Sequence, residues 1–171
     1  NACKLCSPLG ASLVFKGLRG CLPFLHGSQG CATYIRRYLI SHFREPVDIA
    51  SSSFSEDDAI FGGAENFRNG IDNVIRQYQP EILGVATTCL SETIGDDIPT
   101  LIRESRDSGI IPEGKVVIHA NTPSYVGTHI TGWSNMTRAI VSYLSEKSET
   151  PKPQINVIPG YVEPSDTRHL K

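Results

Sequence analysis

The sequence predicts an α/β domain in which helices flank a mostly parallel β-sheet. Short apolar runs typical of buried strands alternate along the chain with longer segments whose apolar residues recur at helical spacing. Strands and helices that alternate in this way are typical of parallel sheets with right-handed crossovers. The chain of 171 residues is long enough for one such domain with a core of its own. We therefore expect residues 1–171 to form a single domain.

The first half of the chain is predicted to contain two helices and one short strand. Residues 31–43 carry apolar side chains at helical spacing, and Pro46 ends this segment because proline disfavours helix in the residue before it. Residues 47–54, VDIASSSF, are predicted to form a short strand that runs into a loop. Residues 64–79 place their large apolar side chains on one stripe, which predicts a helix that closes at Pro80.

The second half is predicted to continue the alternation. We expect a buried strand over residues 82–88, a helix over 91–108, a strand over 115–120, a helix over 134–147 and a last strand over 155–159. Ser91 is the predicted N-cap of the helix that it begins. Residues 148–154, SETPKPQ, form a polar, proline-containing loop and a candidate domain boundary.

The composition is that of an ordinary globular protein, and it argues against several classes of partner. The formal net charge is −2, so no broad surface for nucleic acid or anionic lipid is expected. No apolar run approaches the roughly 20 residues that cross a bilayer. The first residues also lack the basic and apolar regions of a signal peptide, so we expect a cytoplasmic protein. Because the sequence lacks an initiator Met, we expect a fragment of a longer polypeptide.

Five cysteines raise the question of metal binding: Cys3, Cys6, Cys21, Cys31 and Cys89. An odd number of cysteines without a secretory signal argues against a disulfide framework. The thiols are then either buried core side chains or ligands of a metal or an iron–sulfur cluster. Both interpretations are open from the cysteine count alone.

The positions of three cysteines favour the ligand interpretation. The turn HGSQGC, residues 26–31, brings Cys31 to the start of a predicted helix, and the predicted strand over 82–88 runs directly into Cys89. Cys6 precedes another turn, and Ser124 follows the strand over 115–120. Ligands of α/β sheets bind beyond the carboxyl ends of the strands. A helix N-terminus lowers the pKa of a thiol and so favours the thiolate that binds metal.

The same residues also allow simpler interpretations. Cys89 at the end of an apolar strand is also compatible with a core position. The spacing of Cys3 and Cys6 alone does not indicate zinc, because no second ligand pair follows at a suitable spacing. The sequence contains no GxGxxG after a strand and no GxxxxGK[ST] motif, so nucleotide binding has no support.

Six segments together resemble the nitrogenase component 1 family. They are CSPLGA (6–11), HGSQGC (26–31), RRYLISHFREP (36–46), SEDDAIFGG (55–63), TTCLSETIGDD (87–97) and NTPSYVGTHITGW (121–133). The chain is most similar to the β-type subunit of the molybdenum–iron protein and its paralogues, and the similarity covers nearly the whole chain. Family β subunits are much longer, so the resemblance implies a Rossmann-like first domain of such a subunit.

The resemblance also implies roles for individual residues. Cys6, Cys31 and Cys89 match the ligands of half of the P-cluster, an [8Fe–7S] centre shared with an α-type subunit, and Ser124 matches a serine that ligates the oxidised cluster. Cys3 and Cys21 fall outside this pattern.

Three further residues match other family sites. Phe61 matches the docking surface for the ATP-hydrolysing iron protein, and Arg44 and Glu45 match a cation site between subunits.

The function implied by the resemblance is electron transfer in nitrogen fixation. In the family, the iron protein delivers electrons through the P-cluster to a cofactor in the α subunit of an α2β2 heterotetramer, where dinitrogen is reduced to ammonia. No catalytic residue is expected in this chain, and the isolated fragment is expected to be inactive.

Two alternatives are open from the sequence. One is the β-like subunit of the cofactor-assembly scaffold, which would carry a [4Fe–4S] centre. The other is an interaction module without any cluster, because a complete P-cluster needs ligands from the α subunit. The sequence also leaves open whether the partner's cofactor holds molybdenum, vanadium or only iron.

Overall fold

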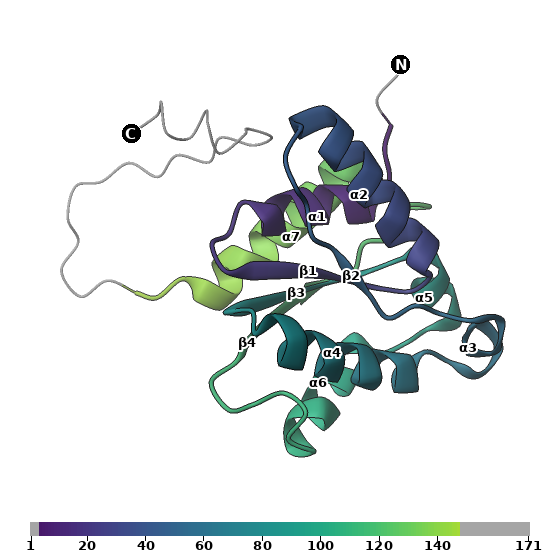
Figure 1. Cartoon of the computed structure of the whole chain (residues 1–171), viewed down its shortest axis with the longest axis vertical. Helices are drawn as coiled ribbons and strands as arrows, with labels where there is room; N and C mark the ends of the chain where they lie inside the picture. Colours follow the sequence, from purple (N-terminus) through teal and green to yellow (C-terminus); the bar gives the residue numbers. More distant parts are fainter. Residues whose placement is uncertain (1–3, 148–171) are drawn as a thin grey trace.

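Four parallel strands form the centre of the structure, in the order β2-β1-β3-β4 (Figure 1). The computed structural model describes residues 4–147. The strands are β1 (Cys21–His26), β2 (Ala50–Ser51), β3 (Ile82–Thr87) and β4 (Val116–Ala120). All three pairings between neighbouring strands are parallel. The predicted α/β fold with a parallel sheet is confirmed.

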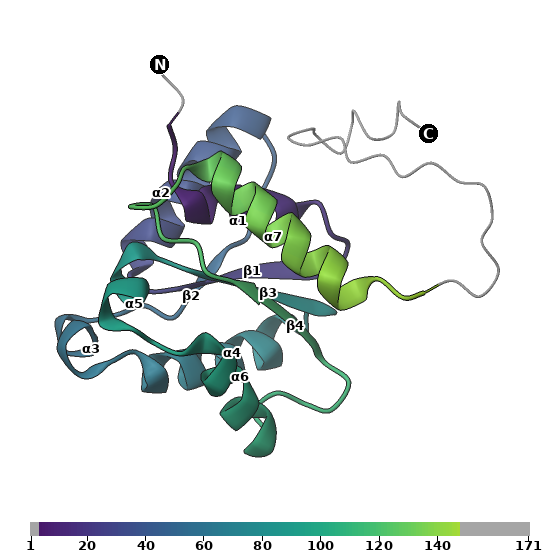
Figure 2. The same ribbon diagram turned by 180° about the vertical axis from the view of Figure 1, so that it is seen from behind.

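Helices cover both faces of the sheet (Figures 1 and 2). One face is covered by α1 (Ser7–Lys16), α2 (Gln29–Phe43) and α7 (His129–Leu144). The other face is covered by α4 (Ala64–Tyr78) and α6 (Ile98–Asp107). Two short helices, α3 (Glu56–Phe61) and α5 (Cys89–Ile94), lie at the end of the sheet where the strands finish.

Each face of the sheet has its own apolar core, because neighbouring residues of a strand point to opposite faces. Leu25 of β1 packs with Phe15 and Met136 on the side of α1 and α7. The preceding residue, Phe24, packs with Phe67 on the side of α4 and α6. The centroids of these two aromatic rings are 5.9 Å apart in an edge-on arrangement. Burial on both faces explains why β1 and β3 are apolar throughout.

Two elements near the N-terminus differ from the sequence prediction. Residues after Cys6 were expected to form a turn, but Ser7–Lys16 is helix α1. Pro8 is compatible with this helix because it lies in the first turn, where the missing N–H would have no helical acceptor. Strand β1 was not predicted, since it contains Pro23. The short β2 pairs only with Phe24 and Leu25 of β1, so Pro23 lies outside that pairing.

The predicted helix over residues 91–108 is wrong as a single element. Gly95, with a φ of 87°, ends α5, and α6 begins after Asp97, whose side chain accepts a hydrogen bond from the N–H of Thr100. The prediction that Ser91 is an N-cap is also wrong, because Thr88 takes that position. Ser91 lies inside α5, and its hydroxyl accepts a hydrogen bond of 3.1 Å from the N–H of Thr88.

Smaller differences concern the ends of other elements. Helix α7 begins at His129 instead of 134, and the strand expected over 47–54 is reduced to Ala50–Ser51. Helix α3 was not predicted. The loop expected over 148–154 and the strand expected over 155–159 lie outside the described residues.

Helices α1 and α7 cross at two glycines. A Cβ atom added to Gly10 would overlap the carbonyl oxygen of His129, and one added to Gly132 would overlap the carbonyl oxygen of Ser7. The two backbones therefore approach each other more closely than any other residue would allow. This contact fixes the start of α1, and with it Cys6, against the start of α7.

We predict that Gly132→Ala lowers the free energy of unfolding by about 1–3 kcal/mol, because the added methyl group has to displace the backbone of α1. Urea unfolding of the variant and the wild-type chain measures this difference. Gly30→Ala is the control, since its Cβ would make only an ordinary contact of 3.6 Å with Ser28. Equal stability of Gly132→Ala and wild type would contradict the described helix crossing.

A second prediction concerns the half-buried thiol of Cys21 in β1. Burial raises its pKa from 9.0 to about 12. Above pH 9 the unfolded chain loses this proton while the folded chain keeps it, so stability falls as the pH rises from 9 towards 12. Between pH 8 and pH 10 the wild-type chain should lose about 1 kcal/mol more than Cys21→Ala. Urea unfolding at both pH values measures this difference, and identical losses in the two proteins would contradict the prediction.

Candidate metal centre

Three free thiols lie at the beginnings of three helices. Cys6 is the N-cap residue of α1, Cys31 is the third residue of α2, and Cys89 is the first residue of α5. All three cysteines are exposed. The N–H groups and dipoles of helix N-termini stabilise negative charge, and the thiolate is the form of cysteine that binds metal.

The register of the sheet brings the loops of two of these cysteines to one edge. His26, the last residue of β1, is paired with Thr87, the last residue of β3. Strand β4 ends at Ala120, which is paired with Ala86. The chain therefore leaves all three strands at nearly the same level, towards Cys31, Cys89 and Ser124 respectively.

The turn after β1 packs directly against the end of β3. Gly27 has a φ of 147°, and a Cβ added to it would overlap the hydroxyl group of Thr88. The N–H of Thr88 also donates a 3.1 Å hydrogen bond to the carbonyl oxygen of His26. This contact holds the turn that leads to Cys31 beside the residue that precedes Cys89.

Ser124 connects the start of α1 with the start of α5. Its N–H donates a 3.2 Å hydrogen bond to the Sγ atom of Cys89. Its hydroxyl oxygen accepts a 3.0 Å hydrogen bond from the N–H of Ser7, the residue after Cys6. The N–H of His129 adds a 2.8 Å hydrogen bond to the carbonyl oxygen of Leu5. The structure thus brings Cys6, Cys89 and Ser124 together.

The thiols also interact electrostatically. Partial burial raises the pKa of Cys6, and the charge of Cys89 raises it further. Partial burial likewise raises the pKa of Cys31, with further contributions from Cys6 and Cys89. Negative charge on Cys6 or Cys89 thus opposes the ionisation of Cys31, and a positively charged group at this place would relieve the repulsion. A metal centre supplies such a charge.

The donor set fits an iron–sulfur cluster. Among residues 4–147, no group of three or more His, Cys, Asp or Glu side chains is arranged to hold one metal ion. Iron–sulfur clusters are held by cysteine thiolates that bind different iron atoms, so their ligands need not converge on one point. Cys6, Cys31 and Cys89 would be the ligands of such a cluster.

The remaining residues singled out in the sequence lie elsewhere. Phe61, at the end of α3, is 85% exposed, and the neighbouring Ile60 is 72% exposed, so α3 ends in an apolar tip. Arg44 and Glu45 follow the end of α2 opposite to Cys31. The carboxylate of Glu45 forms a 3.0 Å ion pair with Lys16 of α1. The structure does not bring these residues to the cysteines.

A buried polar cluster around His26 was missed by the sequence analysis, which considered this residue only as part of the turn HGSQGC. Its side chain is fully buried, with its Nε2 atom 2.9 Å from a carboxylate oxygen of Asp96 and its Nδ1 atom 3.1 Å from the hydroxyl of Ser52. Burial lowers the pKa of His26, although Asp96 opposes this shift. The partners lie 26 and 70 residues along the chain, so no local pattern announces them.

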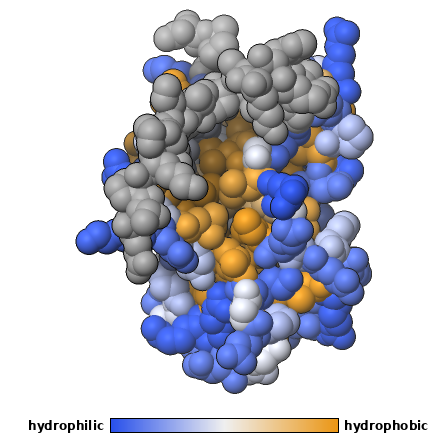
Figure 3. All heavy atoms as spheres, turned by 90° about the vertical axis from the view of Figure 1, so that its left-hand side faces the viewer, coloured by the Kyte–Doolittle hydropathy of each residue, from blue (hydrophilic) through white to orange (hydrophobic). Residues whose placement is uncertain are grey.

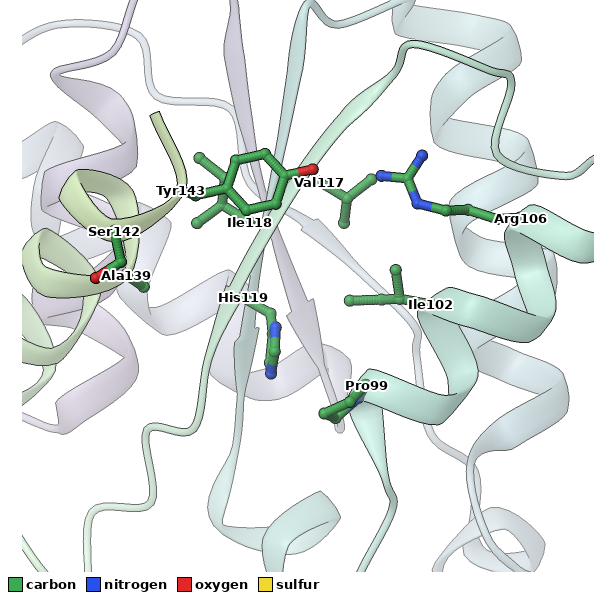
Figure 4. A pocket seen from close by; sticks show the side chains of 9 residues that line it. All are labelled: Pro99, Ile102, Arg106, Val117, Ile118, His119, Ala139, Ser142 and Tyr143. Carbon is green, nitrogen blue, oxygen red and sulfur yellow. The ribbon is translucent and has the colours of Figure 1, made fainter. Parts of the chain in front are cut away.

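A pocket of about 430 Å³ lies on the other side of the domain, over β4 and between α6 and α7 (Figure 4). His119, Arg106 and Tyr143 line it together with apolar side chains. The guanidinium group of Arg106 donates a 2.9 Å hydrogen bond to the carbonyl oxygen of Lys115. None of the predicted site residues lines this pocket.

Apolar atoms also gather at the centre of the face shown in Figure 3. A broad exposed apolar area is typical of a surface that another protein or domain covers. Within residues 4–147, no helix is long and apolar enough to cross a membrane.

Comparisons with known proteins show which family the chain is similar to. The family model described as "Nitrogenase component 1 type Oxidoreductase" matches residues 6–171. The nitrogenase molybdenum-iron protein beta chain of Clostridium pasteurianum is 52% identical over 171 residues, which are 100% of this chain and 37% of the relative. The corresponding chain of Azotobacter vinelandii is 45% identical over 166 residues, which cover 94% of this chain and 32% of the relative.

A solved structure of nitrogenase Cp1 at pH 6.5 has the same fold, with a TM-score of 0.91 and 51% sequence identity over 98% of this chain. The match covers 36% of the solved chain, so the present chain spans about a third of its relatives. On the matching family model and these identities, the chain belongs to the nitrogenase component 1 type oxidoreductases.

Proposed function

We propose that this chain is the first domain of a β-type subunit of a molybdenum–iron protein, and that Cys6, Cys31 and Cys89 ligate half of an [8Fe–7S] P-cluster. The observation that carries the proposal is the placement of three free, electrostatically interacting thiols at three helix N-termini. The names of the similar proteins support the β-type assignment. The other half of the ligand set would come from an α-type subunit.

When bound, the cluster would pass electrons from the ATP-hydrolysing iron protein to a cofactor in the α subunit for the reduction of dinitrogen to ammonia. The residues of this chain would hold the thiolates in place and set their environment. The N–H of Ser124 donates to the sulfur of Cys89, and hydrogen bonds to ligand sulfur raise the reduction potential of an iron–sulfur centre. The hydroxyl of Ser124 would supply an additional oxygen ligand in the oxidised state.

Two surfaces would bind partners. The apolar tip formed by Ile60 and Phe61 would contact the iron protein, because exposed aromatic and aliphatic side chains on a rigid element are typical of docking sites. The face that carries the cysteines would contact the α-type subunit in an α2β2 heterotetramer in the cytoplasm.

Arg44 and Glu45 would contribute to a cation site between subunits. Of these two side chains, Glu45 is the one with oxygen atoms that can bind a cation. Its ion pair with Lys16 would have to loosen when a cation binds. The other ligands would come from residues outside this chain.

The experiment that tests the proposal uses the full-length parent chain co-expressed with its α-type partner under anaerobic conditions. Iron and acid-labile sulfide are measured per αβ unit, and the oxidised protein is analysed by EPR. Iron and sulfide at the level of an [8Fe–7S] centre would support the proposal. A [4Fe–4S] centre would indicate a cofactor-assembly scaffold instead, and protein without iron would indicate an interaction module.

We predict that Cys31→Ala and Cys89→Ala each abolish the cluster, because each removes one of the three thiolates that the proposal assigns to it. Iron analysis of the purified heterotetramers measures this loss. Cys21→Ala is the matched control and should keep its iron, since this half-buried thiol packs against the apolar core and is not one of the proposed ligands. Iron at the wild-type level in either ligand variant would refute the ligand assignment.

For Ser124→Ala we predict an intact reduced cluster and an altered oxidised one. The variant keeps the N–H that donates to Cys89 and loses only the hydroxyl group. Iron content should stay at the wild-type level, whereas the EPR signal of the oxidised protein should change. Loss of the cluster in both redox states would contradict the proposed role.

A further inference from the structure

His26 is connected on one side to the end of α3 and on the other side to the turns that precede Cys31 and Cys89. Its ring is enclosed by Phe54 and Phe67, whose ring centroids are 4.8 Å and 5.1 Å away in edge-on contacts. A carboxylate can only accept hydrogen bonds, so the ring donates from Nε2 to Asp96. The neutral ring then accepts from the hydroxyl of Ser52 at Nδ1.

On one side, the cluster of His26, Ser52 and Asp96 contacts the residues that follow the apolar tip of α3. The carboxylate of Asp96 accepts hydrogen bonds of 3.3 Å from the N–H of Gly63, two residues after Phe61. A Cβ added to Gly63 would overlap the ring of Phe54, so the end of α3 packs closely against the residues around His26. A displacement of the end of α3 would therefore reach Asp96 through Gly63.

On the other side, the backbone of His26 reaches the cysteines. Its carbonyl oxygen accepts a 3.1 Å hydrogen bond from the N–H of Thr88 and a 2.8 Å hydrogen bond from the hydroxyl of Ser91. These two residues form the first turn around Cys89. The next residue, Gly27, donates a 2.8 Å hydrogen bond to the hydroxyl of Ser52 and begins the turn that leads to Cys31.

The side chain of His26 is thus connected through Asp96 to the end of α3, and its backbone is connected to the first turn around Cys89. The ring of His26 is closely packed and has a hydrogen-bond partner at each nitrogen, so it deforms little and transmits a displacement instead of absorbing it. Helix α3 also packs against α5, so the helix that carries the tip has a second connection to the helix that Cys89 begins. An experiment has to separate these two connections.

We propose that His26 and Asp96 are positioning residues that couple the docking of the electron-donating partner at Phe61 to the positions of Cys31 and Cys89. This inference rests on the proposed function. The pair would not ligate the cluster or contact the partner. It would set the arrangement of Cys31 and Cys89 that accompanies docking, and so the rate at which the docked complex transfers an electron.

The test uses Asp96→Ala and Asp96→Asn in the full-length parent chain, purified with its α-type partner. The alanine variant removes the acceptor for both His26 and Gly63, whereas asparagine keeps one acceptor oxygen. Electron transfer from the reduced iron protein with ATP is followed at increasing concentrations of the iron protein. Iron content, the saturating rate and the half-saturating concentration are compared with the wild type.

We expect the saturating rate of Asp96→Ala to fall by roughly 2- to 30-fold, the range for a residue that couples two sites, with a smaller fall for Asp96→Asn. Iron content and the half-saturating concentration should be unchanged. Ser105→Ala is the matched control, because it removes a buried 2.7 Å hydrogen bond to Leu101 inside α6. Its rate should equal that of the wild type.

Three outcomes would overturn the inference: a wild-type saturating rate in both Asp96 variants, a change confined to the half-saturating concentration, or loss of iron from Asp96→Asn. If Asp96→Ala does not fold, Asp96→Asn and His26→Gln decide between the same outcomes. Failure of the proposed function is recognised separately. Cys31→Ala would then keep its iron, or Phe61→Ala would leave the half-saturating concentration unchanged.

Discussion

The in-register pairing of β1 with β3 is the constraint on which the rest of the structure depends. Because His26 and Thr87 are paired, both strands end at the same level, and the helices that follow begin side by side. A shift of one residue would turn every side chain of β1 to the opposite face and exchange Phe24 with Leu25 between the two cores. The cores therefore fix the register, and the register fixes the relative positions of Cys31 and Cys89.

Elements with a strong local pattern could be predicted from the sequence. Strand β3 and helix α4 were predicted almost to the residue, since one is a continuous apolar run without proline and the other has a clear apolar stripe. Helix α1 could not be predicted, because Gly10 is selected by contact with α7 and weakens the helical pattern. The break at Gly95 was missed for a similar reason, as a glycine inside a helical pattern is often tolerated.

In the candidate site too, some residues could be predicted from local sequence patterns and others could not. Cys89 and Ser124 were selected by their positions after predicted strands, a rule that follows from the topology of parallel sheets. Cys31 was selected because the turn HGSQGC brings it to the start of a predicted helix. Phe61 was selected only by resemblance, since no local pattern distinguishes its exposed ring from other exposed apolar side chains. The pairing of His26 with Asp96 depends on two loops that meet only after the sheet has formed.

The contact between α1 and α7 has a consequence for the order in which the domain is made. Cys6 is near the start of the chain, but its place is fixed by Ser124, His129 and Gly132, which leave the ribosome more than a hundred residues later. Until α7 has been synthesised and has folded, Cys6 lacks the contacts from Ser124 and His129 that hold the start of α1 beside Cys89. The arrangement of the three thiols is therefore complete only once α7 has folded, and the cluster proposed for them could bind in that arrangement only after this step.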